Sequence, residues 1–276
     1  MLTRRHFSLA ALTGLIAGRA RATGEGGEAA TGTQTGSAEA DTHDMSAFPP
    51  EWQGSEQIVF LGYQGTTALD LVGPQYMMAS LWGATVRVAA KTREPLKTDT
   101  GLVLLPDVTF DEVPRDLDVI CVPGAISGAL DAMEDTETIE FLADRGSRAR
   151  YVTSVCTGTL LLGQAGLVDG YRVTSHWFTR PLMEAFGAIP VDERVVRDRN
   201  RITGAGVTAG IDFGLTLVRE MRDLPYAQSV QLLAEYDPQP PFDAGTPDKA
   251  PAEVTQMMRS MFAGLPQRIR DLAAPR

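Results

Sequence analysis

The 276-residue sequence predicts an α/β domain in which a mostly parallel β-sheet is covered by helices on both faces. Three observations support this. Strand-like runs alternate with helix-like runs along residues 57–262. The run 118–122 is almost wholly apolar, as in a strand buried on both faces. Residues 151–163 pass directly from a β-branched strand into an apolar helix, which places Cys156 at the corner between them.

The strands are recognised by β-branched and aromatic residues between turn residues. Alternation over 194–203 around the turn residues Arg199 and Asn200 predicts a hairpin. The expected strands are 57–63, 85–90, 102–108, 118–122, 151–155 and 173–175.

The helices are recognised by apolar runs that end at breakers such as Gly83 and Gly146. Residues 236–251 are rich in proline and are expected to be irregular. The expected helices are 68–82, 136–145, 157–167, 206–221, 225–235 and 253–262.

Composition excludes several classes of function. The net charge is −10 and no long run of Lys or Arg occurs, so we expect no nucleic-acid partner. There are two cysteines and three histidines, without CxxC or HExxH spacing, so we expect no metal. The glycines of 204–210 lack the context of a dinucleotide fingerprint, so no cofactor is expected. Cys121 lies within the apolar run 118–122 and is interpreted as inert core, not as a disulfide partner of Cys156.

The N-terminus predicts export. Arg4-Arg5, an apolar run over 9–17 and the cleavage pattern Ala20-Arg21-Ala22 are typical of a twin-arginine signal peptide, which we assign to residues 1–22. The alternatives are a chance basic start or an uncleaved anchor, but this run is shorter than the roughly 20 residues that span a bilayer. We therefore expect the twin-arginine export machinery as a partner, a periplasmic location, a disordered linker over 23–46 and a single domain over 47–276.

Cys156 is the first candidate for chemistry. A strand that turns directly into a helix leaves the corner residue at the carboxyl edge of the sheet, where open α/β sheets bind ligands. A thiol at a helix N-terminus can lose its proton below the usual pKa of about 8.5, so an activated cysteine is expected. The alternative is that Cys156 is simply a small buried apolar residue.

Several motifs together are similar to a known family. The corner 154–158 (Ser-Val-Cys-Thr-Gly) and the segment 68–74 (Ala-Leu-Asp-Leu-Val-Gly-Pro) resemble the isonitrile hydratases, in the PfpI-like branch of the class I glutamine-amidotransferase-like superfamily. Further matching stretches are 121–124, 174–177, 206–214 and 236–242. The resemblance covers about residues 55–272 and implies a flavodoxin-like three-layer sandwich with a cysteine nucleophile elbow. It also implies a homodimer and a lyase that adds water to R–N≡C.

The resemblance places the essential residues of the family at Asp70, Cys156 and Thr157. We expect Asp70 to supply a proton and Cys156 to attack the isonitrile carbon, giving a thioimidate that water resolves. The alternative for Asp70 is an N-cap. Thr157 is expected to bind the substrate nitrogen or the water, and its N–H to complete an anion hole with Gly124 or Ala125. The alternative for Thr157 is an ordinary residue of a first helical turn.

His176 and Trp177 end a short strand at the same predicted edge, where they are candidates to line the pocket, together with Phe178. The alternatives are a structural histidine bonded to backbone and aromatics that serve the core or a dimer contact. Asp212 is interpreted as a cap residue in the first turn of its helix.

The function that fits best is hydration of a small-molecule isonitrile to an N-substituted formamide. Two alternatives stay open. One is another cysteine-dependent hydrolase or deglycase, which would usually need a base beside the cysteine, where Thr157 stands. The other is a non-enzymatic periplasmic redox or small-molecule sensor, since a cysteine at the positive end of a helix oxidises readily.

Overall fold

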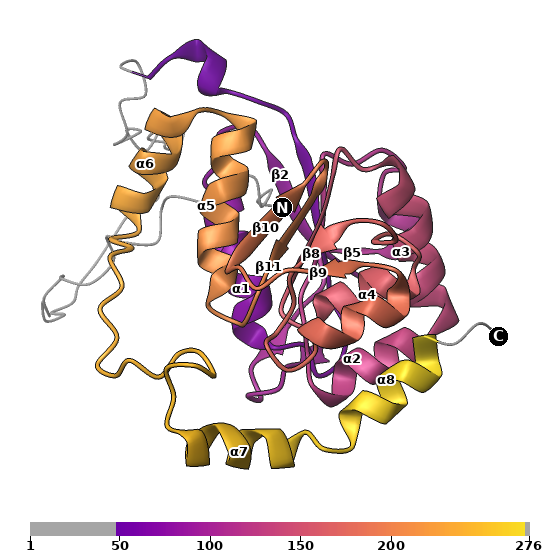
Figure 1. Ribbon diagram of the computed structural model, residues 1–276. Helices are drawn as coiled ribbons and strands as arrows, with labels where there is room; N and C mark the ends of the chain where they lie inside the picture. The colour runs from indigo at the N-terminus through magenta and orange to yellow at the C-terminus, as the bar shows by residue number, and fades with distance from the viewer. Residues whose placement is uncertain (1–47, 274–276) are drawn as a thin grey trace, which may run out of the picture. The chain divides into compact units, whose positions relative to one another are not determined.

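A seven-stranded sheet forms the centre of the computed structural model, which describes residues 48–273 (Figure 1). The strand order is β10-β11-β7-β6-β1-β2-β5, and every neighbouring pair is parallel except the hairpin β10–β11. The signal peptide predicted for residues 1–22 and the linker predicted for 23–46 lie outside the described residues. The strands of this sheet are β1 (Gln57–Leu61), β2 (Thr85–Ala90), β5 (Val108–Thr109), β6 (Val119–Val122), β7 (Tyr151–Val155), β10 (Val195–Asp198) and β11 (Arg201–Gly204).

Short pairs of strands and a set of helices complete the described residues. The two small sheets are β3 (Leu96–Lys97) with β4 (Val103–Leu104), antiparallel, and β8 (Arg172–Val173) with β9 (Ile189–Pro190), parallel. The α-helices are α1 (Ala68–Ala79), α2 (Ser127–Glu134), α3 (Thr136–Arg148), α4 (Gly158–Gln164), α5 (Ala209–Met221), α6 (Leu224–Leu233), α7 (Ala252–Met261) and α8 (Leu265–Ala273). The 3₁₀ helices are η1 (Pro50–Trp52), η2 (Phe110–Glu112) and η3 (Arg180–Phe186).

The helices form two layers on the faces of the sheet. Helices α1, α5 and α6 bury Met78, Phe213 and Val230 in one apolar cluster. Helices α2, α3, α4 and α8 bury Leu130 and Ile269, among others, in the cluster on the opposite face. The strands β6 and β7 between these clusters are wholly buried. The predicted flavodoxin-like three-layer α/β fold is therefore confirmed.

The element predictions differ from the structure in several places. The single strand expected over 102–108 is two short strands, β4 and β5, which belong to different sheets. The helix expected to run to about residue 167 ends at Gln164. Helices α2 and α8 were not expected, and α8 begins just before Pro266, a position that tolerates proline because the first helical N–H groups have no partner.

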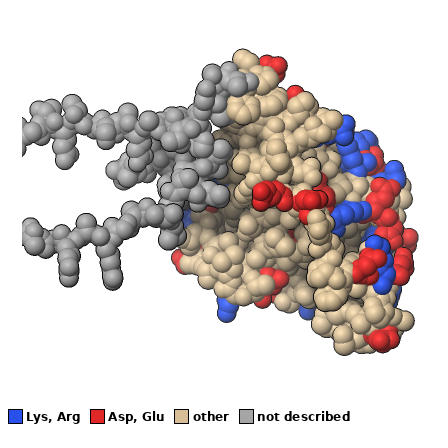
Figure 2. Space-filling model, turned by 90° about the vertical axis from the view of Figure 1, so that its left-hand side faces the viewer, with Lys and Arg blue, Asp and Glu red and all other residues tan. Residues whose placement is uncertain are grey.

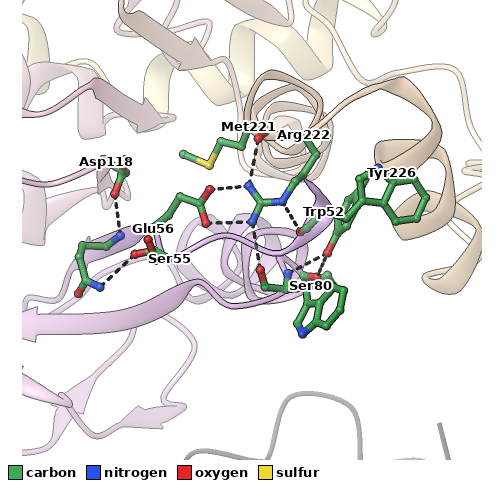
Figure 3. A network of polar contacts seen from close by, with 10 residues as sticks. Trp52, Ser55, Glu56, Ser80, Asp118, Met221, Arg222 and Tyr226 are labelled. Carbon is green, nitrogen blue, oxygen red and sulfur yellow. Dashed lines mark hydrogen bonds and ion pairs between the residues drawn. The ribbon is translucent and has the colours of Figure 1, made fainter. Parts of the chain in front are cut away.

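A buried ion pair connects Glu56, the residue before β1, to Arg222 in the turn between α5 and α6 (Figure 3). The guanidinium of Arg222 donates to both carboxylate oxygens of Glu56, and its remaining N–H groups donate to the carbonyl oxygens of Trp52, Trp82 and Met221. Burial raises the pKa of Glu56, but the bonds to Arg222 outweigh it and leave that pKa below its ordinary value. The pair is fully hydrogen-bonded, which is the condition for a buried ion pair to be tolerated.

The surface in Figure 2 is the side on which α5 and α6 lie in Figure 1. Most of the visible face carries neither Lys, Arg, Asp nor Glu, apart from a few small acidic and basic groups, and mixed charges gather along one margin. Among the described residues, no helix is long and apolar enough to cross a membrane.

Candidate active site

Cys156 occupies a strained corner between β7 and α4. Its φ is +59°, a left-handed conformation that a residue with a side chain seldom adopts. The backbone N–H of Cys156 donates to the carbonyl of Gly204 at 3.0 Å, and the Cys156 carbonyl accepts from Ser175 Oγ at 2.8 Å. These bonds on both sides of the residue hold the strained backbone in place, and the thiol lies at the carboxyl edge of the sheet.

Gly158 allows this corner to lie close to the neighbouring strand. A Cβ atom at Gly158 would come within 2.1 Å of the Val122 carbonyl oxygen at the end of β6. A side chain at 158 would therefore push the start of α4, and Cys156 with it, away from the loop that follows β6.

Asp70 approaches the thiol from the first turn of α1. Its side chain is fully buried, and its Oδ2 accepts the N–H of Gly124 at 2.9 Å. The carboxyl also interacts with the thiol of Cys156. The structure thus brings Asp70 and Cys156 together, two of the three residues that were expected to be essential, although they lie 86 positions apart in the chain.

The loop 123–125 connects Asp70 with Thr157. The Thr157 hydroxyl accepts the N–H of Ala125 at 2.8 Å and donates to the Ala125 carbonyl at 2.5 Å. The backbone N–H of Thr157 is directed at the Cys156 thiol. The two amides that were candidates for an anion hole, those of Gly124 and Ala125, are therefore engaged by Asp70 and Thr157 in this structure.

Two further bonds make this loop rigid. The Tyr63 hydroxyl donates to the carbonyl of Pro123 at 2.8 Å, and the N–H of Thr67 donates to the carbonyl of Gly124 at 2.8 Å. A Cβ atom at Gly124 would lie 2.6 Å from Thr157 Oγ1 and 2.7 Å from Asp70 Oδ2. Only glycine therefore allows the loop to lie between these two side chains.

Burial sets the protonation of the pair. It raises the pKa of Asp70 to about 7, against the lowering effect of the Gly124 N–H and the Cys156 thiol, and the charge of Asp99 adds to the rise. Burial, and next the charge of Asp70, raise the pKa of Cys156 well above its ordinary value. The lowered thiol pKa that the helix N-terminus led us to expect is therefore not found, because burial outweighs the hydrogen bonds from Thr157 that lower the pKa, and Cys156 is an uncharged thiol at neutral pH.

A cavity of about 130 Å³ opens at the thiol. Its polar lining includes Thr67, Thr157 and Thr179, with Asp99 exposed at its rim. Its apolar lining comes from the elements on the α2 face, from Val207 and from the C-terminal segment: Ala125, Ile126, Leu130, Leu160, Phe178, Phe262, Leu265 and Ile269.

His176 lines this cavity as an uncharged imidazole. Burial, and next the charge of Arg180, lower its pKa to about 4. Its Nδ1 accepts the N–H of Phe178 at 3.4 Å, which leaves the proton on Nε2. Trp177, the other candidate, is not a lining residue. Its ring meets Phe178 and Phe262 edge-on behind the cavity, with centroids 5.6 Å and 6.4 Å away.

The other candidate residues lie outside the cavity. Asp212, in the first turn of α5, accepts from Arg194 Nε at 2.5 Å and from the Tyr236 hydroxyl at 3.2 Å, so it joins the segment after α6 to α5. Cys121 is a free, fully buried thiol in β6, and burial raises its pKa to about 12, in accord with the core role expected for it. Within residues 48–273, no cluster of His, Cys, Asp and Glu has a geometry suited to a metal ion.

Sequence reasoning missed two parts of the site. Asp99, in the β3–β4 hairpin, accepts the N–H of Ala68 at 3.1 Å and thereby caps the helix that carries Asp70. Nothing in the turn-like run 97–101 connects it with residue 70. Phe262 was expected only as the end of a terminal helix, and its place over Cys156 follows from the docking of α8, which was not expected.

Comparison with known proteins gives consistent results. Residues 56–220 match the model of the DJ-1/PfpI family. The chain is 50% identical over 207 residues to an isonitrile hydratase of Pseudomonas putida, covering 75% of this chain and 90% of that protein. The crystal structure of a ThiJ/PfpI family protein from Pseudomonas syringae has a TM-score of 0.82 and 50% identity, covering 85% of this chain and 99% of that one. Drosophila melanogaster DJ-1beta shares the fold at 21% identity, with a TM-score of 0.61 over 67% of this chain and 100% of that one.

Proposed function

The chain belongs to the DJ-1/PfpI family, as its motifs indicated, and we propose that it is a cysteine-dependent hydro-lyase that converts isonitriles to N-substituted formamides. The observation that carries the proposal is the contact between the buried carboxyl of Asp70 and the thiol of Cys156, which itself lines the cavity. The carboxyl retains a proton near neutral pH and the thiol is uncharged, and an isonitrile carbon needs both a proton and a nucleophile.

The first step joins the substrate to the enzyme. Asp70 gives its proton to the terminal carbon of R–N≡C while Sγ of Cys156 forms a bond to the same carbon. The thiol proton passes to the Asp70 carboxylate as the C–S bond forms. The product is the thioimidate R–N=CH–S–Cys156, and Asp70 is again protonated. Because the carboxyl interacts directly with the thiol, a carbon bonded to Sγ lies beside the acid.

The second step releases the product. Water adds to the C=N bond, with its oxygen on carbon and one proton on nitrogen, and gives R–NH–CH(OH)–S–Cys156. The C–S bond then breaks, the hydroxyl proton leaves as the C=O bond forms, and the sulfur regains a proton. The sum is R–N≡C plus water giving R–NH–CHO. Asp70 is the group placed to accept and return protons in this step, since its pKa is about 7.

Thr157, Gly124 and Ala125 are positioning residues in this mechanism. The Thr157 hydroxyl accepts the N–H of Ala125 and donates to the Ala125 carbonyl, and the N–H of Gly124 donates to the carboxyl of Asp70. The amide of Gly124 or Ala125 could act as an anion hole only if its bond to Asp70 or Thr157 were broken. The N–H of Thr157, which is directed at Sγ, favours negative charge on the sulfur when the thiol leaves. His176, with its proton on Nε2, is the group in the cavity placed to bind the attacking water.

The test is an assay of the purified protein with cyclohexyl isonitrile, with the formamide followed by chromatography. The proposal predicts turnover that Cys156→Ala abolishes and that Asp70→Asn lowers by at least a hundredfold, since general acid catalysis contributes about 10²–10⁴. Folded wild-type protein without turnover of any isonitrile would rule the proposal out. Turnover that survives in Cys156→Ala would retain the activity and reject the cysteine mechanism.

We also propose that the chain forms a homodimer through α1. Leu69, Val72 and Tyr76 lie on one face of this helix at spacings of three and four residues, and all three are exposed. An apolar stripe of this kind on a surface helix is typical of a protein–protein contact, and a second copy of the chain is the occupant proposed here.

A further inference from the structure

The C-terminal segment 262–269 supplies one wall of the cavity at Cys156. Phe262 and Ile269 are 7% and 1% exposed, and both line the cavity together with Leu265. This segment lies beyond residue 220, the last that the family model matches. The wall therefore lies outside the part of the chain that the family model matches.

Helix α8 is firmly attached, whereas α7 is not. Ile269 packs into the apolar cluster of the α2 face, and α8 contacts η3, α2 and α4 (Figure 1). Helix α7 has no buried residue, and Met257 and Met261 are largely exposed. Phe262 thus stands where an exposed helix meets an anchored one, and its ring position is set by its own contacts.

Those contacts hold the ring over the cavity. The Phe262 ring lies 4.8 Å from the Phe178 ring and 6.1 Å from the His176 ring, centroid to centroid, within the usual range for aromatic pairs. The guanidinium of Arg259, one turn earlier, lies 5.3 Å over the ring of Trp177. The aromatic residues 176–178 therefore contact both Arg259 of α7 and Phe262 of the cavity wall, and so hold this part of the C-terminal segment in place.

The size of the cavity defines what fits beside the thiol. A cavity of about 130 Å³ is close to the roughly 150 Å³ apolar cavity that holds a benzene molecule in another protein. Asp99 is the only Asp, Glu, Lys or Arg among the lining residues, and it is exposed at the rim. A compact uncharged hydrocarbon group therefore fits the interior, whereas the carboxylate side chain of Asp99 repels an anionic group at the entrance.

We infer that Phe262 is the specificity-determining residue of this site, and that it limits substrates to isonitriles whose substituent is an uncharged hydrocarbon of about six carbons. The inference rests on the proposed function for the identity of the reacting group. The size limit, however, applies to any reagent that must reach Cys156, so the size limit and the proposed reaction can be tested separately.

The experiment measures alkylation of Cys156 in the full chain by N-methyl-, N-cyclohexyl- and N-(1-pyrenyl)maleimide, each of which adds its C=C bond to the thiol without a leaving group. Rates come from the mass of the Cys156 peptide. In Phe262→Ala, the ratio of the pyrenyl rate to the methyl rate should rise at least tenfold over wild type. In Phe262→Trp, the ratio of the cyclohexyl rate to the methyl rate should fall. Phe242→Ala is the matched control, because Phe242 is 80% exposed and lies outside the cavity.

Ratios that stay at their wild-type values in both Phe262 variants would overturn the inference, as would an equal change in Phe242→Ala. If Phe262→Ala fails to fold, Phe262→Trp and Phe262→Leu decide the question by the same ratios. Ratios that change as expected in a protein that hydrates no isonitrile would defeat the proposed function and leave Phe262 as the size limit. Hydration of isonitriles together with unchanged alkylation ratios would support the proposed function and reject Phe262 as the size limit. When hydration is present, the same variants should shift kcat/KM between cyclohexyl and 1-adamantyl isonitrile in the same sense.

Discussion

Asp70 and Cys156 show how one physical effect prepares two groups for different tasks. Burial raises the pKa of both, so the carboxyl keeps a proton it would lose in water and the thiol keeps its own. The site therefore stores a proton beside a nucleophile and avoids a resting thiolate, which is the form most open to oxidation. The pair interacts strongly, so the two protons titrate jointly.

The buried acid should cost stability at neutral pH. Since the native pKa of Asp70 lies above its ordinary value, its contribution to stability is fully present below about pH 4 and is lost as the pH rises to about 7. The difference between 3.8 and about 7 corresponds to about 4 kcal/mol. Asp70→Asn removes this dependence, and its carbonyl oxygen can still accept from Gly124.

Urea unfolding at pH 4.5 and pH 8 measures this effect. The free energy of unfolding of Asp70→Asn, relative to that of wild type, should be higher at pH 8 than at pH 4.5. The activity of the variant should be lost. A variant that is destabilised equally at both values would show that Asp70 is ionised in the native protein at both.

Asp99 should tune Asp70 by charge. Asp99→Asn keeps an acceptor for the N–H of Ala68 and removes the negative charge that raises the pKa of Asp70. The alkaline limb of the kcat/KM profile should therefore move to lower pH, because activity needs a protonated Asp70. The shift should shrink at 1 M salt, where charges are screened within about 3 Å. A profile that does not move at low salt would contradict this electrostatic role.

At the scale of elements, the loop 123–125 between β6 and α2 contacts both Asp70 and Thr157, and so fixes the position of Asp70 relative to the turn at Cys156. Gly124→Ala places a methyl group where Asp70 Oδ2 and Thr157 Oγ1 lie, so we expect a loss of about 1–3 kcal/mol in stability and at least tenfold in kcat. Ala125→Gly is the control, since it retains the N–H that donates to Thr157. Thermal unfolding and turnover of the two variants provide the comparison, and Gly124→Ala with wild-type kcat would show that the loop does not position Asp70.

The corner at Cys156 could be predicted, because it is encoded in a continuous run of the chain, whereas the role of Asp70 beside it was expected only from the resemblance of the segment 68–74 to the family. The strand 151–155 passes into α4 without an intervening loop, and Asp70 opens an apolar helix. The wall at Phe262 could not be predicted, because it depends on where α8 docks. The run 265–273 is amphipathic, but its sequence does not specify which surface of the domain its apolar face covers. Asp99 was missed for a similar reason. Its bond to Ala68 joins a hairpin tip to a helix start 31 residues away, and local sequence does not specify that pairing.

At the scale of the whole molecule, the exposed stripe on α1 connects assembly with the site. Asp70 lies buried on the same helix whose outer face carries Val72 and Tyr76. A second copy packed on this face would remove apolar surface from water and restrict the helix that positions the acid.

The assembly prediction concerns mass in solution. Tyr76→Asp should convert a dimer to a monomer in light scattering coupled to size-exclusion chromatography, since it places a charge in an apolar contact. Leu105→Asp is the matched control, because Leu105 is 64% exposed and belongs to the segment between β4 and β5, not to α1. A wild-type monomer, or a dimer that only Leu105→Asp dissociates, would contradict the proposed interface.

The central claim is that Cys156 forms a thioimidate while Asp70 supplies and recovers the proton. The most direct measurement is the intact mass of the protein quenched in acid during turnover of cyclohexyl isonitrile, with peptide mapping of the adduct. The account predicts an added mass equal to one substrate molecule on Cys156, which disappears when substrate is exhausted and never forms in Cys156→Ala. Turnover without any adduct on Cys156, or an adduct that persists after product formation ends, would contradict it.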